Sequence, residues 1–179
     1  MKKKMQHNKQ FLNLGLTAIE MMVVIAIVGI LATIAFPAYQ GLVQNFRTRT
    51  LATDLRSTLS LARSEAIKRS QTVTICPTAN ADFTACGSAN DWQNGWIVFI
   101  DPNDSGVITN IQDRIKTQDA LGPGVNFSTA QNRLSFNSLG YSTNGIYTIN
   151  LNAPGCTGSN GRRFEISVTG RVLINAIDC

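Results

Sequence analysis

The stretch NLGLTAIEMMVVIAIVGILATIAFPAY, residues 13–39, decides the fold because it contains one long apolar run. Residues 16–36 include only three polar side chains, those of Thr17, Glu20 and Thr33. As a helix this run would be roughly 32 Å long, enough to cross the hydrocarbon core of a bilayer. We therefore expect a membrane-spanning helix near the N-terminus.

A basic leader precedes the apolar run and carries Lys2, Lys3, Lys4 and Lys9. The positive-inside rule keeps such a leader in the cytoplasm and sends the rest of the chain across the membrane. We therefore expect a single-pass membrane protein whose C-terminal domain lies across the membrane from the cytoplasm.

The net charge of the chain comes largely from this leader. The formal charge of +5 reflects 16 Lys and Arg against 11 Asp and Glu, and without the leader lysines it falls to +1. The remaining charge is uneven: residues 40–70 are basic, 77–124 acidic and 125–179 mildly basic. Overall basicity therefore gives no argument for a nucleic-acid partner, although local basic regions could attract a polyanion.

Two simpler interpretations of the apolar run leave features unexplained. A secretory signal peptide has an apolar region of about 7–15 residues and then a small-residue cleavage site, unlike this run. An ordinary signal-anchor does not explain Glu20, because a carboxylate inside a bilayer costs a few kcal/mol unless it has a partner. Glu20 therefore marks a candidate functional site.

The basic leader, Gly15, Glu20 and Pro37 together resemble the N-terminal signature of type IV pilins and type II secretion pseudopilins. The resemblance implies that a prepilin peptidase cuts after Gly15 and methylates the new N-terminus at Leu16. It also implies that Pro37 kinks the helix. The family usually has Phe at the position of Leu16 and Leu at that of Ala18, and neither departure should stop cleavage.

The resemblance also explains the intramembrane acid. In assembled pili of this family the glutamate pairs with the free N-terminal amine of a neighbouring subunit, so Glu20 would neutralise that charge. The helix would first hold the subunit in the inner membrane and then pack against other pilins in the filament core.

The apolar pattern continues beyond the membrane segment. Leu51, Leu55, Leu59, Ala62 and Ala66 recur at helical spacing and predict an amphipathic helix to about residue 70. We divide the chain into a cleaved leader (1–15), a transmembrane helix (16–37), its amphipathic continuation (38–70) and a periplasmic β-rich domain (71–179).

Three arginines lie on another face of this helix. Arg49, Arg56 and Arg63 recur every seven residues. The spacing indicates either a solvated flank of the helix or a contact with a polyanion.

Short strands with turn residues between them fill the rest of the chain. They are expected at 71–76, 95–101, 114–118, 133–140, 145–151, 162–169 and 170–176. The last two could form a hairpin across Thr169 and Gly170. The fold class is therefore α+β, with a long N-terminal helix packed on an antiparallel β-sheet or sandwich, and Trp92 or Trp96 closing the core.

Four cysteines allow three disulfide connectivities. We expect Cys76–Cys86 and Cys156–Cys179, because each of these pairs brackets a loop rich in small polar residues. Zinc is the alternative, but there is no C-x-x-C spacing and the only histidine, His7, lies in the leader. Disulfides require an exported domain.

The middle of the chain narrows the resemblance. The segments LARSEAIKRSQTVTICP (61–77), WQNGWIVFIDPNDSG (92–106) and FEISVTGRV (164–172) are similar to the GspH/FimT group of minor pilins and pseudopilins. A FimT- or FimU-like minor pilin implies a place in the initiation complex or tip of a type IV pilus at the cell surface. The alternative is a minor pseudopilin of a type II secretion system.

Some FimT proteins are associated with DNA uptake through a C-terminal Gly-Arg-x-Arg motif. Gly170 and Arg171 match its first half, but Leu173 stands in place of the second arginine. Arg162 and Arg163 offer a further basic pair, and together with Arg171 they could bind double-stranded DNA weakly.

Two alternatives to ligand binding stay open in the C-terminal half. Arg163 or Arg171 could instead pair with Glu165 or Asp178 on a polar strand face. In the segment 101–106, DPNDSG, the oxygen-bearing residues resemble the start of a calcium loop, yet the closing acid is absent, and an Asx-type turn is the alternative.

No enzymatic activity, cofactor or metal is expected. After Gly15 there is no histidine, which removes histidine-dependent triads and histidine zinc sites. No G-x-S-x-G or P-loop motif occurs.

Overall fold

The computed structural model describes residues 17–122 and 124–179, without the side chain of Ala38. The chain divides into two compact units, of which the first ends at Ala38 and the second spans Tyr39–Cys179. One helix, α1 (Ala18–Arg69), belongs to both units.

In the first unit, α1 presents apolar side chains on every face. All large apolar residues from Ile19 to Phe36 have at least 47% of their surface exposed. Pro37 lies inside the helix and does not end it. A bend at Pro37 stays a prediction.

The C-terminus of α1 is closed by a Schellman motif. Ser70 adopts a positive φ of 54°, its N–H donates to the Ile67 carbonyl at 3.3 Å, and the Gln71 N–H donates to the Ala66 carbonyl at 3.2 Å. These two bonds satisfy carbonyls that the helix end leaves open. The sequence expectation of a helix to about residue 70 is confirmed.

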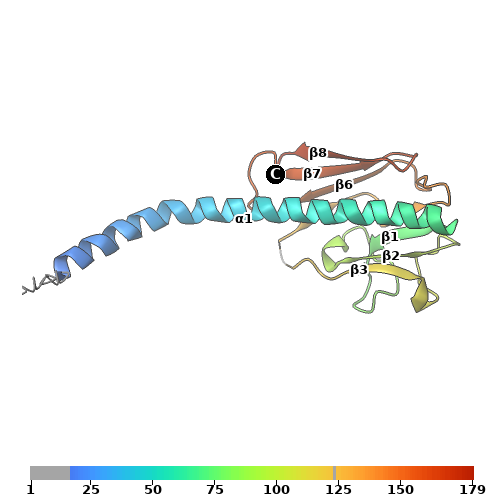
Figure 1. The fold of residues 1–179 in the computed structure, drawn as a ribbon, viewed down its shortest axis with the longest axis horizontal. Coiled ribbons are helices and arrows are strands. Elements are labelled where there is room, and N and C mark those ends of the chain that lie inside the picture. Colours follow the sequence, from blue (N-terminus) through green and yellow to red (C-terminus); the bar gives the residue numbers. More distant parts are fainter. Residues whose placement is uncertain (1–16, 123) are drawn as a thin grey trace, which may run out of the picture. The chain divides into compact units, whose positions relative to one another are not determined.

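The second unit adds eight strands in two antiparallel sheets, with α1 beside both in Figure 1. The first sheet has the order β3-β2-β1-β5 and the second the order β4-β6-β7-β8. The strands are β1 (Val73–Pro77), β2 (Trp96–Ile100), β3 (Arg114–Gln118), β4 (Asn126–Ser128), β5 (Leu134–Phe136), β6 (Tyr147–Asn152), β7 (Gly161–Ile166) and β8 (Val172–Ile177). Two 3-10 helices, η1 (Trp92–Asn94) and η2 (Ile111–Asp113), lie in the connections.

One stripe of α1 unites the two sheets in a single core. Leu55, Leu59, Ala62 and Ala66 have no exposed surface, and they cluster with buried residues of β1, β2, β5, β6 and β7. The stripe follows the i, i+4, i+7, i+11 spacing that places side chains on one helix face. The amphipathic pattern expected from the sequence is therefore the core-facing surface of α1.

Aromatic side chains close one end of this core. Trp92 and Trp96 are both fully buried, with ring centroids 6.2 Å apart, and Phe127 lies 6.0 Å from Trp92. Tyr147 is also buried and its hydroxyl donates to the Gln131 carbonyl at 2.7 Å. Burial raises the pKa of Tyr147 to about 12, so the hydroxyl keeps its proton at physiological pH.

Two sequence expectations about strands were incomplete. The expected strand at 133–140 forms only over β5, because the Asn137 side chain accepts the N–H groups of Leu139 and Tyr141 and turns the chain. The three-residue strand β4 was missed, because its sequence, NFS, has no alternating pattern. Phe127, its central residue, is the side chain that packs on Trp92.

Removing one buried side chain from α1 tests the shared core. In the domain of residues 39–179, Leu59→Ala should lower the free energy of unfolding by about 2–5 kcal/mol, because it leaves a cavity between the helix and the sheets. The matched change Arg56→Ala, on an exposed face of the same helix, should stay within about 0.5 kcal/mol of wild type. Urea unfolding monitored by tryptophan fluorescence measures both, and equal effects would contradict this packing.

Candidate functional site

The expected processing site lies only partly within the described residues. Gly15 and Leu16 fall outside them. Thr17 precedes α1 and forms a capping box with Glu20: the Thr17 N–H and hydroxyl donate to Glu20 Oε2 at 2.9 and 2.8 Å, and the Glu20 N–H donates to Thr17 Oγ1 at 3.3 Å. Glu20 therefore fixes the first turn of the helix.

The capping box uses one carboxylate oxygen of Glu20. Within the described residues, every hydrogen bond to this side chain goes to Oε2, so Oε1 keeps its capacity to accept a further donor. The carboxylate thus has an internal partner in the single chain and room for a second partner.

By length and composition, α1 can cross a membrane. Its most apolar 18-residue window has a mean hydropathy of 2.6, and none of that window is buried within the protein.

Two disulfides connect the cysteines in the pairing expected from the sequence. Cys76–Cys86 joins β1 to the following loop, and Cys156–Cys179 joins the loop before β7 to the residues after β8. Cys76 is fully buried with Ile97 and Phe99 on the face of the first sheet that does not meet α1. The first disulfide therefore holds the β1–β2 connection, residues 78–95, against that face.

Two of the three evenly spaced helix arginines bind the second sheet. Arg49 donates to Asn160 Oδ1 at 3.1 Å, and Arg63 donates to the carbonyls of Gly140 and Thr169, both at 3.0 Å. Arg56, between them, makes no such contact within the described residues. Arg49 and Arg63 therefore act as clamps, meaning side chains of α1 that hydrogen-bond to loops of the β domain. Of the three arginines, only Arg56 lies on a solvated flank of the helix.

The first sheet has its own polar link to α1. Lys116 on β3 donates to Asp54 Oδ1 at 3.3 Å and to Thr58 Oγ1 at 2.8 Å. Polar contacts therefore join both sheets to the helix at the margins of the core.

The arginines proposed for DNA lie at the two ends of the β7–β8 hairpin. Arg162 and Arg163 follow each other at the start of β7, so they project from opposite faces of the sheet. Arg171 lies across from Ser167, at the turn of the hairpin. Arg163 pairs with Asn175 on β8, and Asn175 is four residues, or about 13 Å, further along the chain than Arg171. The three arginines therefore do not form one cluster: Arg162 and Arg163 point to opposite faces of the sheet, and Arg171 lies at the other end of the hairpin.

These arginines do not pair with the acidic residues that the sequence offered as partners. Arg163 donates to Asn150 Oδ1 at 2.9 Å, and Arg162 donates to the carbonyls of Ser159 and Gly161. The Arg171 side chain has no partner within the described residues. No ion pair in this part of the chain joins any of the three to a carboxylate.

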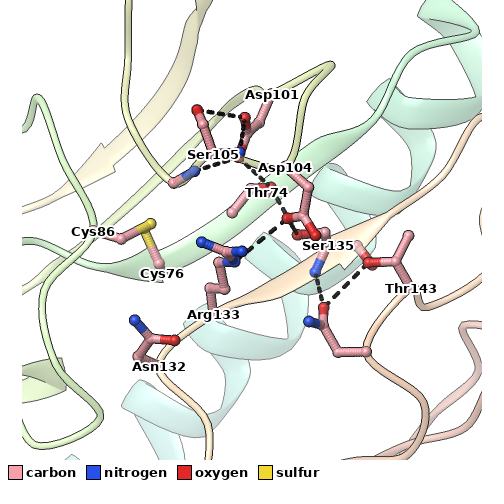
Figure 2. Close-up of polar contacts among 12 residues, drawn as sticks. Thr74, Cys76, Cys86, Asp101, Asp104, Ser105, Asn132, Arg133, Ser135 and Thr143 are labelled. Carbon is pink, nitrogen blue, oxygen red and sulfur yellow. Dashed lines mark hydrogen bonds and ion pairs between the residues drawn. A yellow bond between two sulfur atoms is a disulfide. The ribbon is translucent and has the colours of Figure 1, made fainter.

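Asp101 organises the loop that resembled a calcium site. Its Oδ1 accepts the N–H and hydroxyl of Ser105 at 2.8 and 3.1 Å, and its Oδ2 accepts the Gly106 N–H at 2.9 Å and the Thr74 hydroxyl at 3.1 Å. Figure 2 shows this turn above β1. Four protein donors thus occupy the carboxylate, but its backbone donors lie four and five residues further on, whereas an Asx turn would use the N–H two residues on. The described residues contain no group of three or more metal-binding side chains.

A chain of hydroxyls continues from Asp101 to the protein surface (Figure 2). Thr74 Oγ1 lies 2.8 Å from Ser135 Oγ, Ser135 donates to Asp104 Oδ1 at 2.7 Å, and Asp104 forms an ion pair with Arg133 at 3.4 Å. Thr74 and Ser135 are fully buried, so neither offers an accessible nucleophile. The network fixes the 101–106 loop to β1 and β5.

Sequence reasoning missed this network. The available signal was the polar residue in the middle of each of two buried strands, Thr74 in VTICP and Ser135 in LSF. A buried hydroxyl in such a position needs a partner, but only the paired strands bring these two together.

Residues 51–170 match the family profile described as "Type II transport protein GspH". Among solved structures, the chain is similar to the type IV minor pilin FimU of Pseudomonas aeruginosa in two crystal forms. The first has 20% identity and a TM-score of 0.55, over 72% of this chain and 87% of that one. The second has 22% identity and a TM-score of 0.53, over 71% and 91%.

The minor pseudopilin EpsH from the Type 2 Secretion System of Vibrio cholerae is similar to nearly the same degree. It has 17% identity and a TM-score of 0.52, over 73% of this chain and 97% of that one. No curated protein sequence matches the chain. Identities this low establish a shared fold, and the two kinds of relative do not differ enough in similarity to separate their functions.

Replacing Asp101 by its amide tests the turn. Asp101→Asn should lower the free energy of unfolding of residues 39–179 by about 2–3 kcal/mol, because the new amide N–H₂ faces donors that lose a charged acceptor. Asp82→Asn is the control, since Asp82 is exposed and its side chain accepts no hydrogen bond within the described residues. Thermal unfolding that gave the same midpoint for both variants would contradict this role.

Proposed function

Because the chain belongs to the GspH family of type II transport proteins, we propose that it is a minor pilin of a type IV pilus. Members of this family are structural pilins and pseudopilins that assemble with other pilins, and they are not enzymes. In this proposal the prepilin peptidase cuts between Gly15 and Leu16 at the inner membrane, and the subunit then enters a filament at the cell surface.

The exposed apolar surface from Ile19 to Phe36 carries the proposal. A helix that is apolar all round requires a membrane or other apolar helices around it. The second unit already has its own closed core, so this surface serves a different environment. The lipid bilayer would shield this apolar surface from water before assembly. The helices of neighbouring pilins would shield it afterwards.

Glu20 supports assembly by a charge pair. Cleavage before Leu16 creates an ammonium group, and Oε1 of Glu20 is the oxygen that can accept it from a neighbouring subunit while Oε2 keeps the capping box. A subunit in the wrong register would leave both charges unpaired in an apolar environment, at a cost of several kcal/mol.

Two disulfides favour the pilus over the secretion system. A pilus subunit reaches the cell surface, where covalent links protect its loops. The alternative, a minor pseudopilin of a type II secretion system, draws support from the similarity to EpsH.

A DNA contact is a second candidate function, favoured by the basic side chains of the β7–β8 hairpin. Arg171 is exposed and has no partner within the described residues, and Arg163 is exposed with only an amide partner. Two separated contacts with phosphates would bind double-stranded DNA weakly and would depend strongly on salt.

Deletion of the gene in the native host should remove pili and leave the release of exoproteins unchanged. The full-length chain should restore pili, as should Leu16→Phe, which keeps the cleavage site. Gly15→Arg should not, because the leader stays attached. Electron microscopy and mass spectrometry of the N-terminus measure both steps, and lost exoprotein release with normal pili would favour the pseudopilin alternative.

Neutralising the hairpin arginines tests DNA binding. The combined change Arg162→Gln, Arg163→Gln and Arg171→Gln should weaken retardation of duplex DNA by residues 39–179. The plot of log affinity against log salt, which has a negative slope, should also become shallower, by about one unit of slope for each phosphate that the variant no longer neutralises. Arg114→Gln, in the acidic part of the chain, is the control. Unchanged retardation by the triple variant would show that these arginines do not bind DNA.

A further inference from the structure

A basic groove of about 450 Å³ lies between α1 and the start of β8. Its polar lining comes from Arg56, Ser60, Arg63 and Ser64 on α1 and from Arg171 on the hairpin. The helix residues follow a spacing of four, three and one, which places them on one face next to the buried stripe. None of the residues lining the groove is acidic.

No ion pair among the described residues neutralises the arginines of the groove. Arg63 donates only to neutral carbonyl oxygens, those of Gly140 and Thr169. Glu65, on the same turns of α1, instead contacts Lys68 and Arg69, and its hydrogen bond with Arg69 lowers its pKa. An anion from outside would therefore meet uncompensated arginines.

Two side chains of the groove are free to bind such an anion. Arg56 and Arg171 are exposed and have no side-chain partner within the described residues. A guanidinium binds carboxylate or phosphate through two parallel N–H groups, which makes arginine well suited to such groups.

An apolar rim lies beside the groove. Ile67 lines it, and Leu139, Tyr141 and Val168 lie on the two turns that Arg63 binds; their exposed fractions are 48%, 68%, 47% and 52%. The Ser142 N–H donates to the Val168 carbonyl at 2.9 Å, which holds the two turns together. Exposed apolar side chains in one place indicate a surface for protein contact.

The two turns beside the groove also pack closely against each other. Gly140 and Gly170 both have positive φ, of 76° and 74°, and a Cβ on Gly170 would lie 2.0 Å from the Gly140 carbonyl oxygen. The two turns can approach each other this closely only because position 170 is a glycine and has no Cβ.

We propose that the basic groove and the apolar rim together bind a segment of a neighbouring filament subunit that carries both carboxylate and apolar side chains. The proposal rests on the proposed filament function. Carboxylates would pair with Arg56 and Arg171, and apolar side chains would cover Ile67, Leu139 and Val168. Three of the four rim side chains, Ile67, Leu139 and Val168, are aliphatic and have no counterpart in a phosphate backbone, which favours a protein over DNA.

Photo-crosslinking of the full-length chain in its host tests the proposal. A photoreactive residue at Leu139 should link the chain, in sheared filaments, to an acidic segment of another subunit that mass spectrometry identifies. The same residue at Ile111, which is also exposed on η2, should not reach that segment. Arg56→Glu with Arg171→Glu should reduce the Leu139 product at least about tenfold, because it reverses the attraction.

Two matched variants separate charge from disruption. Arg56→Lys with Arg171→Lys should retain most of the product, and Arg114→Glu with Arg163→Glu, an equal change in net charge elsewhere, should leave it unchanged. Three outcomes would each overturn this inference without affecting the proposed function. They are a Leu139 product that survives charge reversal in the groove, no Leu139 product from the wild-type chain although it is present in filaments, and a crosslink to DNA in place of a protein. Absence of the wild-type chain from filaments would overturn the proposed function, and the inference with it.

Discussion

The buried stripe of α1 is the contact on which the rest of the second unit depends. Leu55, Leu59, Ala62 and Ala66 are shared by two sheets that form no strand pairs with each other. Without this stripe each sheet would expose one apolar face to water. The helix therefore covers the apolar faces of both sheets, as one sheet covers the other in a β-sandwich.

The polar contacts of α1 follow from the same arrangement. A helix between two sheets has margins on both sides of its buried stripe, and long cationic side chains there can reach the loops of either sheet. Arg49 and Arg63 reach the second sheet, and Lys116 reaches back from the first. Arg56 lies between Arg49 and Arg63 on the helix, and its side chain has no partner within the described residues. The groove that Arg56 lines is positively charged, because none of its lining residues is acidic.

Much of the site could be predicted from the sequence, because its signals are local. The end of α1 and the two disulfide pairs depend on spacing within one segment or one hairpin. The capping box of Thr17 and Glu20 is equally local, but the sequence analysis did not predict it. The Thr74–Ser135 contact, the Arg63 clamp and β4 could not be predicted, because each joins segments whose separation in sequence carries no periodic signal. The Gly140–Gly170 contact is of the same kind.

Residue order alone indicates that a long helix, apolar at first and amphipathic afterwards, precedes a disulfide-linked antiparallel β domain. Hydrophobic period and turn chemistry are properties of short stretches of chain, so they can be read from residue order. Residue order does not show which arginines bind backbone carbonyls and which have no partner within the described residues. That distinction depends on where carbonyls of distant turns lie, and packing of the shared core places them.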